Sequence, residues 1–206
     1  TAAGSPRWIG TTRRRTCGRQ WRRWRLRALI NSAAAVLDGK LYAVGGLNDD
    51  DSALSSVERY DPATNAWEAV APMAEARRVL AVAVLDGKLY AVGGYDGGFL
   101  SSVERYDPAL DVWEVVTPMA EARNRPGVAV LDGKLYAVGG YDGGWITSVD
   151  RYDPTTNVWE TVAPMASARD EFAVAVLDGK LYAVGGDSDD GFLSSVERYD
   201  PALNAW

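Results

Sequence analysis

The apolar positions of the chain form short runs typical of β-strands. In residues 81–92 the run AVAVL precedes Asp86-Gly87, and the run KLYAV follows this pair. A short Val-rich run is typical of a strand that is buried on both faces. An Asp-Gly pair between two apolar runs favours a two-residue hairpin in which both central residues have positive φ. The segment therefore predicts two antiparallel strands.

Two further strands follow in the same segment. The run SSVERY alternates Val103 and Arg105 with Glu104 and Tyr106, which predicts a half-buried strand. The run DVWEVV at 111–116 predicts an outermost strand that ends before a proline. Helical periodicity is absent from the repeats, so the pattern indicates four strands in succession.

This four-strand pattern recurs along the chain. The sequence LDGKLYAVGG occurs at 37–46, 85–94, 131–140 and 177–186, with spacings of 48, 46 and 46 residues. A period between about 20 and 50 residues indicates a solenoid, a propeller or an array. A unit of four short antiparallel strands cannot cover its own faces, which favours a β-propeller blade. The fold class predicted is therefore all-β, a propeller of four-stranded antiparallel blades.

The repeats resemble the Kelch family. Three features carry the resemblance, namely the double glycine, the Tyr of a Tyr-Asp-Pro motif and a later Trp: Gly45, Gly46, Gly93, Gly94, Gly139, Gly140, Gly185, Gly186, Tyr60, Tyr106, Tyr152, Tyr199, Trp67, Trp113, Trp159 and Trp206. The order YAVGGYDGG, SSVERYDP, W and APM is most similar to the propellers of BTB–Kelch adaptors. The glycines are expected to permit close backbone approach. The Tyr and Trp side chains are expected to pack between neighbouring blades.

The repeat boundaries divide residues 31–206 into blades at about 31–73, 74–119, 120–165 and 166–206. The Kelch proteins resembled usually have six blades, so the resemblance implies part of a larger ring of about six. A closed ring of four blades is the alternative. An unclosed stack exposes apolar blade faces, which makes self-association an expected property.

Comparison of the four copies separates a variable face from a constant one. The copies differ after the double glycine and in the triplet after a repeated Arg, where RVL, NRP and DEF occupy 78–80, 124–126 and 170–172. In an antiparallel blade both regions lie on the same face, and binding residues concentrate on such loops. Aromatic residues and Arg are enriched in interface hot spots. We predict that this face binds a partner through Arg77, Arg78, Tyr95, Phe99, Arg123, Arg125, Tyr141, Trp145, Arg169 and Asp187, with Phe192 nearby.

The resemblance to BTB–Kelch adaptors implies roles for two of these positions. The Arg four residues after the Met, here Arg77, Arg123 and Arg169, lines a substrate-peptide pocket in such adaptors. The residue after the double glycine, here Leu47, Tyr95, Tyr141 and Asp187, contacts ligand. For the three arginines, the alternative is pairing with carboxylates of the blades.

The resemblance implies a protein–protein interaction module, such as the substrate-recognition part of a ubiquitin-ligase adaptor. The alternatives are a propeller fragment of a larger enzyme and a structural or cytoskeletal Kelch protein.

Catalytic and cofactor sites are not predicted. The chain has no His and one Cys, Cys17, which excludes a zinc cluster, an intramolecular disulfide and the His-containing copper site of Kelch oxidases. The GGYDGG segment lacks the following helix of a phosphate loop. The DSDDG segment lacks the 12-residue frame of a calcium loop that ends in Glu. We expect no enzyme activity, no cofactor and no metal.

Charge divides the chain into two parts. Nine of the 22 basic residues precede Ala28, the first acid is Asp38, and residues 28–206 carry a net charge of −15. An acidic body repels nucleic acid and anionic membranes, and no apolar run reaches the ~20 residues that span a bilayer. We expect protein or peptide partners, no nucleic acid, no membrane and a cytoplasmic location.

The basic segment at residues 1–30 has its own interpretation. Read one base out of step, codons permitted for residues 11–28 yield YDPATNVWEAVAPMA(S/T)AR, which is the missing half of a Kelch blade. We interpret residues 1–30 as a non-native segment produced by a frame shift. The alternatives are an Arg-rich arm that binds phosphates and a mitochondrial transit peptide.

Overall fold

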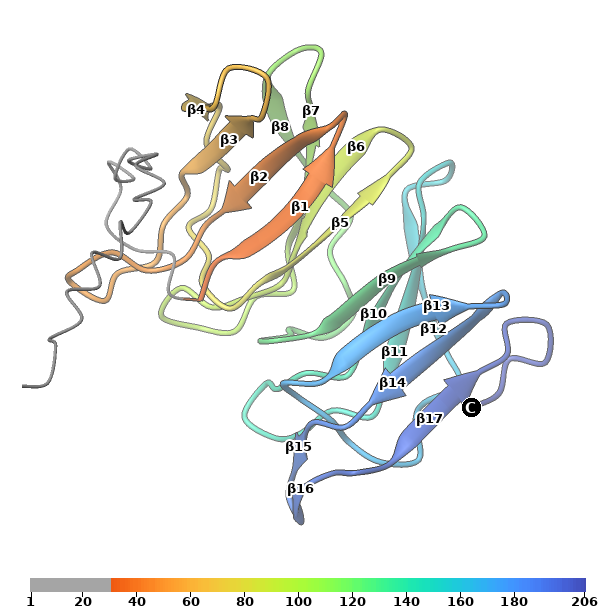
Figure 1. The fold of residues 1–206 in the computed structure, drawn as a ribbon. Helices are drawn as coiled ribbons and strands as arrows, with labels where there is room; N and C mark the ends of the chain where they lie inside the picture. Colours follow the sequence, from red (N-terminus) through yellow and green to blue (C-terminus); the bar gives the residue numbers. More distant parts are fainter. Residues whose placement is uncertain (1–30) are drawn as a thin grey trace, which may run out of the picture.

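The computed structural model describes residues 31–206, and the expectation for residues 1–30 lies outside the described residues. The regular elements of the described part are β-strands (Figure 1). Among residues 31–206 no helix is long and apolar enough to cross a membrane.

Each of the first three repeats forms a four-stranded antiparallel sheet whose strands follow chain order. Blade 1 contains β1 (Ala33–Leu37), β2 (Lys40–Val44), β3 (Val57–Asp61) and β4 (Ala66–Val70). Blade 2 contains β5 (Ala81–Leu85), β6 (Lys88–Val92), β7 (Val103–Asp107) and β8 (Val112–Val116). Blade 3 contains β9 (Gly127–Leu131), β10 (Lys134–Val138), β11 (Val149–Asp153) and β12 (Val158–Val162).

Blade 4 has a three-stranded sheet made of β13 (Ala173–Leu177), β14 (Lys180–Val184) and β17 (Val196–Tyr199). A short hairpin of β15 (Asp187–Ser188) and β16 (Gly191–Phe192) separates β14 from β17. After β17, Asp200 and Ala205 form an isolated bridge, at the position where Asp153 and Val158 begin the pairing of β11 with β12 in blade 3.

The first turn of each blade has the geometry that its Asp-Gly pair predicts. Asp86 has a φ of 51° and Gly87 a φ of 69°, and Lys88 pairs with Leu85 across the turn. Positive φ at both central residues matches the right-handed twist of the two flanking strands. The predicted hairpin is therefore confirmed.

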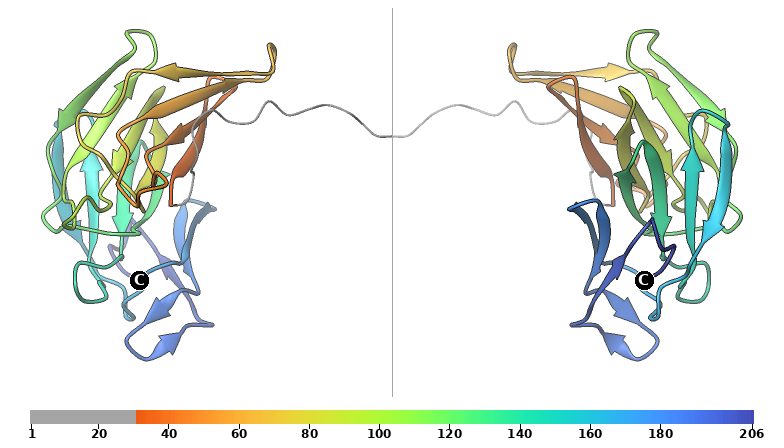
Figure 2. Two further views of the ribbon diagram at one scale, coloured as in Figure 1. Left: turned by 90° about the vertical axis from the view of Figure 1, so that its left-hand side faces the viewer. Right: turned by 90° about the vertical axis from the view of Figure 1, so that its right-hand side faces the viewer.

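The four blades follow one another along an arc, with the first and last blades at its two ends (Figure 1). Each innermost strand packs beside the innermost strand of the next blade, in the order β1, β5, β9 and β13. The side views show the same succession of sheets (Figure 2). The predicted all-β propeller architecture is confirmed.

Apolar side chains between neighbouring blades form the core, in three clusters. At the junction of blades 1 and 2, for example, Val44 and Met73 pack with Leu89 and Tyr106. The Trp113 Nε1–H of blade 2 donates a hydrogen bond to the Ala71 carbonyl oxygen at 2.9 Å. The recurring Tyr and Trp therefore join each blade to the preceding one.

Two strand environments differ from the expectation. The β5 residues before Leu85 are half-buried and not buried on both faces, because β5 is the innermost strand of its blade. In β7 the expected half-buried alternation is also wrong, since Val103, Glu104 and Tyr106 are all buried. Blades cover both faces of β7, and Glu104 pairs with Arg77 of the preceding loop.

One apolar face is left open at the end of the arc. In blade 4, Leu177 is 58%, Val184 41% and Val196 56% exposed. Their equivalents in blade 3 are covered by blade 4 and are at most 4% exposed: Leu131, Val138 and Val149. The residues of this face are the same apolar types that are buried between blades 3 and 4. Residues 31–206 supply nothing that covers them.

Candidate functional site

The two variable regions of the repeats meet on one face of the arc, which we call the loop face. Arg78, in the loop from blade 1 to blade 2, donates its N–H to the Tyr95 carbonyl at 3.1 Å. The Tyr95 N–H donates to the Arg78 carbonyl at 2.9 Å. Asn124 pairs with Tyr141 in the same way between blades 2 and 3.

The double glycine makes this pairing possible. Gly94 has a φ of 105°, and a Cβ at that position would lie 2.8 Å from the Arg78 carbonyl oxygen. A side chain there would separate the two loops, so glycine is required by both the conformation and the space. The repeated motif thus fixes where the variable residues stand.

Four aromatic rings form a continuous row along the loop face, which we call the aromatic row. Tyr95 and Phe99 have ring centroids 5.4 Å apart, Phe99 and Tyr141 5.7 Å, and Tyr141 and Trp145 5.4 Å. All three pairs are edge-to-face, which is a favourable arrangement of ring quadrupoles. The rings are half-buried, so they pack against one another and are still reachable from solvent.

Arg78 stands at one end of the aromatic row. Its guanidinium carbon lies 4.8 Å from the centroid of the Tyr95 ring, a cation–π geometry. Within residues 31–206 no carboxylate forms an ion pair with Arg78. The loop face therefore presents a guanidinium that a ring orients and no described acid neutralises.

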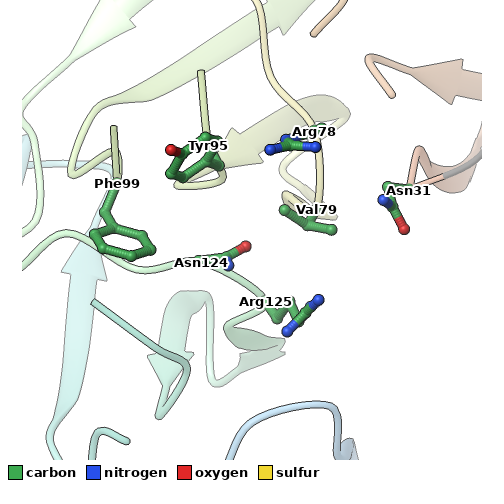
Figure 3. Close-up of a pocket in the computed structure, with 7 residues that line it drawn as sticks. All are labelled: Asn31, Arg78, Val79, Tyr95, Phe99, Asn124 and Arg125. Atoms are coloured by element: carbon green, nitrogen blue, oxygen red, sulfur yellow. The ribbon is translucent and has the colours of Figure 1, made fainter. Parts of the chain in front are cut away.

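Two adjacent pockets lie along the row. The first pocket has a volume of about 170 Å³ and is lined by Asn31, Arg78, Val79, Tyr95, Phe99, Asn124 and Arg125 (Figure 3). The second pocket has a volume of about 230 Å³ and is lined by Arg125, Tyr141, Trp145, Asp170, Glu171 and Asp187. Arg125 belongs to both linings and separates the two spaces.

An inner rim of four equivalent residues borders these pockets. Asn31, Val79, Arg125 and Glu171 occupy the same position in successive repeats, and their φ angles are 62°, 48°, 50° and 50°. The Val79 N–H donates to the Asn31 carbonyl at 2.7 Å, and the Arg125 N–H donates to the Val79 carbonyl at 2.9 Å. A left-handed conformation is unusual for a β-branched residue such as Val79. Backbone strain of this kind is concentrated at functional sites.

Carboxylates dominate the second pocket. Arg125 lies 3.4 Å from Asp170 Oδ2 and 3.1 Å from Glu171 Oε1. Asp170 is only 4% exposed. Burial raises the pKa of Asp170, and Glu171 and Asp187 raise it further, although Arg125 opposes them.

Three of the predicted binding residues are placed elsewhere. Arg77, Arg123 and Arg169 are fully buried, so the expectation that they contact a partner is wrong. Each guanidinium crosses to the next blade, where Arg123 donates to the carbonyl oxygens of Gly139 and Ser148 at 2.9 and 3.0 Å. Arg123 also lies 2.9 Å from the Asp150 carboxylate. We call these three residues the arginine latches.

The structure brings seven predicted residues to the pockets and leaves two apart, Phe192 and Leu47, of which Leu47 is buried and lines neither pocket. Arg78, Tyr95, Phe99, Arg125, Tyr141, Trp145 and Asp187 line the two pockets. Phe192 is 94% exposed on β16 and lines neither pocket.

Sequence comparison of the copies missed five lining residues: Asn31, Val79, Asn124, Asp170 and Glu171. The variable triplets RVL, NRP and DEF contain four of the five, so variation at the first and middle triplet positions was the available signal. Among residues 31–206 no group of three His, Cys, Asp or Glu side chains is placed to hold a metal ion.

Comparisons with known proteins bear on the repeats and the fold. The Kelch motif matches residues 29–74, 77–120, 122–166 and 168–206. Kelch-like protein 35 from Homo sapiens is 54% identical over 48 residues, and that from Mus musculus is 53% identical over 47 residues. Each match covers 23% of this chain and 8% of the relative.

The solved structure of YjhT superposes with a TM-score of 0.71 at 17% identity. The superposition covers 83% of this chain and 68% of that chain, and at this identity it supports the fold alone. The matched motif covers nearly all of residues 29–206, and the blades have the architecture it implies. The chain therefore belongs to the Kelch-motif family.

Proposed function

We propose that the loop face binds an extended segment of a partner protein across the aromatic row. The observation that carries this proposal is the unbroken series of rings from Tyr95 to Trp145, which joins two pockets across blades 2 and 3. Rigid aromatic side chains supply large contact areas at low entropic cost and are typical anchors of interfaces. The Kelch propeller is itself a common interaction module.

The finer proposal concerns what binding achieves. The resemblance to BTB–Kelch adaptors favours a substrate-recognition role in a ubiquitin-ligase adaptor, acting in the cytoplasm and without catalysis of its own. The matched segment spans only 8% of the curated Kelch-like relatives, so this role is inferred from the propeller alone. A propeller fragment of an enzyme and a cytoskeletal Kelch protein are the alternatives.

The binding proposal can be tested with a phage-displayed library of random 12-residue peptides, selected on the purified chain. We expect enriched peptides to bind wild type and to lose affinity for Tyr95→Ala and Trp145→Ala. The matched control is Leu110→Ala, since Leu110 is 70% exposed in the turn between β7 and β8, away from the loop face. Failure to enrich any peptide, or equal binding to the aromatic variants, would contradict the proposal.

We also propose that copies of the chain associate end to end. The open face of blade 4 presents Leu177, Val184 and Val196. The equivalent residues of blade 3 are buried in the interface between blades 3 and 4. At the other end, Leu41 and Tyr60 of blade 1 are equivalent to Leu89 and Tyr106, which fill the other half at the junction of blades 1 and 2. A second copy thus carries, on its blade 1, the kind of surface that covers the equivalent face of blade 3 at the junction of blades 3 and 4.

A further inference from the structure

The two pockets of the loop face carry opposite charge. The first pocket is lined by two cations, Arg78 and Arg125, and by no carboxylate. The second is lined by three carboxylates, Asp170, Glu171 and Asp187, with Arg125 as the one cation. Because the pockets share Arg125, a chain lying along the aromatic row passes directly from positive to negative surroundings.

The available cation in the first pocket is Arg78. Arg125 is already engaged by Asp170 and Glu171, whereas no described acid pairs with Arg78. The Tyr95 ring holds the Arg78 guanidinium in place. A planar guanidinium forms paired hydrogen bonds with a carboxylate, so this pocket is suited to an Asp or Glu side chain.

The same pocket contains an unsatisfied acceptor. The Asn124 side chain is 9% exposed, and its Oδ1 has no hydrogen-bond donor among the described residues. Figure 3 shows the Asn124 amide between Tyr95 and Arg125. A buried acceptor without a donor is costly, so an N–H of a bound peptide backbone would stabilise this arrangement.

The second pocket lacks positive charge. One guanidinium faces three carboxylates, and burial together with the neighbouring acids raises the pKa of Asp170. A Lys or Arg side chain entering this pocket would favour the ionised carboxylates. The Tyr141 and Trp145 rings would cover the apolar stem of that side chain and attract its cationic head.

We propose that the partner segment is an extended peptide of mixed charge, with a carboxylate at Arg78 and a Lys or Arg beside Asp170 and Asp187. This inference rests on the proposed function and specifies its ligand. It assigns the polarity of the peptide along the row, from acidic at blades 1 and 2 to basic at blades 3 and 4.

The same 12-residue peptide library, selected separately on wild type and charge variants, tests the inference. We expect wild type to enrich peptides that contain an acidic and a basic residue at a constant spacing. Arg78→Glu should replace the acidic position by a basic one, and Asp187→Lys should replace the basic position by an acidic one. The control is Arg198→Glu, an exposed residue of β17 outside both pockets, which should keep the wild-type consensus.

Synthetic peptides from the wild-type selection give the quantitative check. Each charge reversal in a pocket should weaken binding at least about tenfold, the effect of losing a charge-assisted hydrogen bond. Glu171→Lys replaces Asp187→Lys if thermal melting shows that the latter unfolds. An uncharged consensus, or one of a single sign, whose binding still requires Tyr95 and Trp145 overturns only the mixed-charge inference. The absence of any enriched peptide overturns the loop-face function as well.

Discussion

The Arg78 guanidinium lies 4.8 Å from the centroid of the Tyr95 ring, and the same two residues exchange backbone hydrogen bonds. One residue precedes blade 2 and the other follows its second strand, so the contact joins two loops that the sequence separates. The pair places a charged group at a fixed point beside the first pocket.

Replacement of Tyr95 by Leu should therefore affect binding more than stability. Leu keeps an apolar contact but removes the ring that orients Arg78, and a cation–π contact at a half-exposed site contributes only about 0.5–1 kcal/mol. We expect a melting temperature within a few degrees of wild type and a clearly weaker affinity for a selected peptide. Calorimetry on the same samples measures both quantities, and unchanged affinity would show that the orientation of Arg78 is irrelevant.

The arginine latches should show the opposite behaviour. Arg123→Ala leaves the Asp150 carboxylate buried without its guanidinium, and breaking a buried pair in this way costs about 3–5 kcal/mol. Arg151→Ala is the matched control, because its partner Glu160 has a 55% exposed side chain and exposed pairs contribute about 0–1 kcal/mol. Urea unfolding curves compare the two variants, and a loss of under about 1 kcal/mol for Arg123→Ala would contradict the latch.

Two equivalent glutamates should respond oppositely to pH. In blade 1, burial raises the pKa of Glu58. In blade 4, burial also acts to raise the pKa of Glu197, but the Ala166 N–H, Arg169 and the Ser167 N–H together lower it. By the repeat spacing, the position before blade 1 that is equivalent to Arg169 is occupied by Leu29.

The raised pKa of Glu58 means that ionisation destabilises the folded state once the pH exceeds the unfolded value of about 4.3. Glu58→Gln should therefore raise the free energy of unfolding at pH 7, with the gain disappearing as the pH falls below that value. Because the pKa of Glu197 is lowered, its ionised form stabilises the fold above about pH 4.3. This stabilisation is lost as the pH falls through the pKa of Glu197 in the folded state. Glu197→Gln should thus destabilise at pH 7, and unfolding curves from pH 3 to pH 7 that show the same sign for both variants would refute this account.

The open face of blade 4 should control association. Leu177→Glu and Val196→Glu place a charge on a surface that a second copy would cover, so both should shift the chain toward monomer. Leu110→Glu changes another exposed apolar residue outside that face and should leave association unchanged. Analytical ultracentrifugation over a range of concentrations gives the mass, and a wild-type chain that stays monomeric throughout would rule out the end-to-end contact.

The coding DNA tests the interpretation of residues 1–30. A shifted Kelch half-blade requires that codons for Gly10–Ala28 contain TAC-GAC, TGG and ATG triplets one base out of step. Sequencing the gene and its transcript should show these triplets. Codons incompatible with the shifted sequence would restore the phosphate-binding arm and the transit peptide as explanations.

Sequence alone determined the blades because each depends on local chemistry. Asp86-Gly87 permits two successive positive φ angles, and the Val-rich runs beside it form the paired strands β5 and β6. The double glycine likewise indicated a close backbone approach. A Cβ at Gly94 would lie only 2.8 Å from the Arg78 carbonyl oxygen. The loop face was also predictable, since strand direction in an antiparallel blade decides which loops share an end.

Tertiary structure alone decided which arginines face solvent. Arg77 and Arg78 are adjacent in sequence and chemically identical, yet Arg77 is fully buried against Glu104 and Arg78 lies half-buried beside Tyr95. The difference depends on the next blade, which supplies carbonyls and a carboxylate to one guanidinium and an aromatic ring to the other. The opposite charges of the two pockets have the same origin, because packing of blades 3 and 4 brings Asp170 and Asp187 together from separate loops.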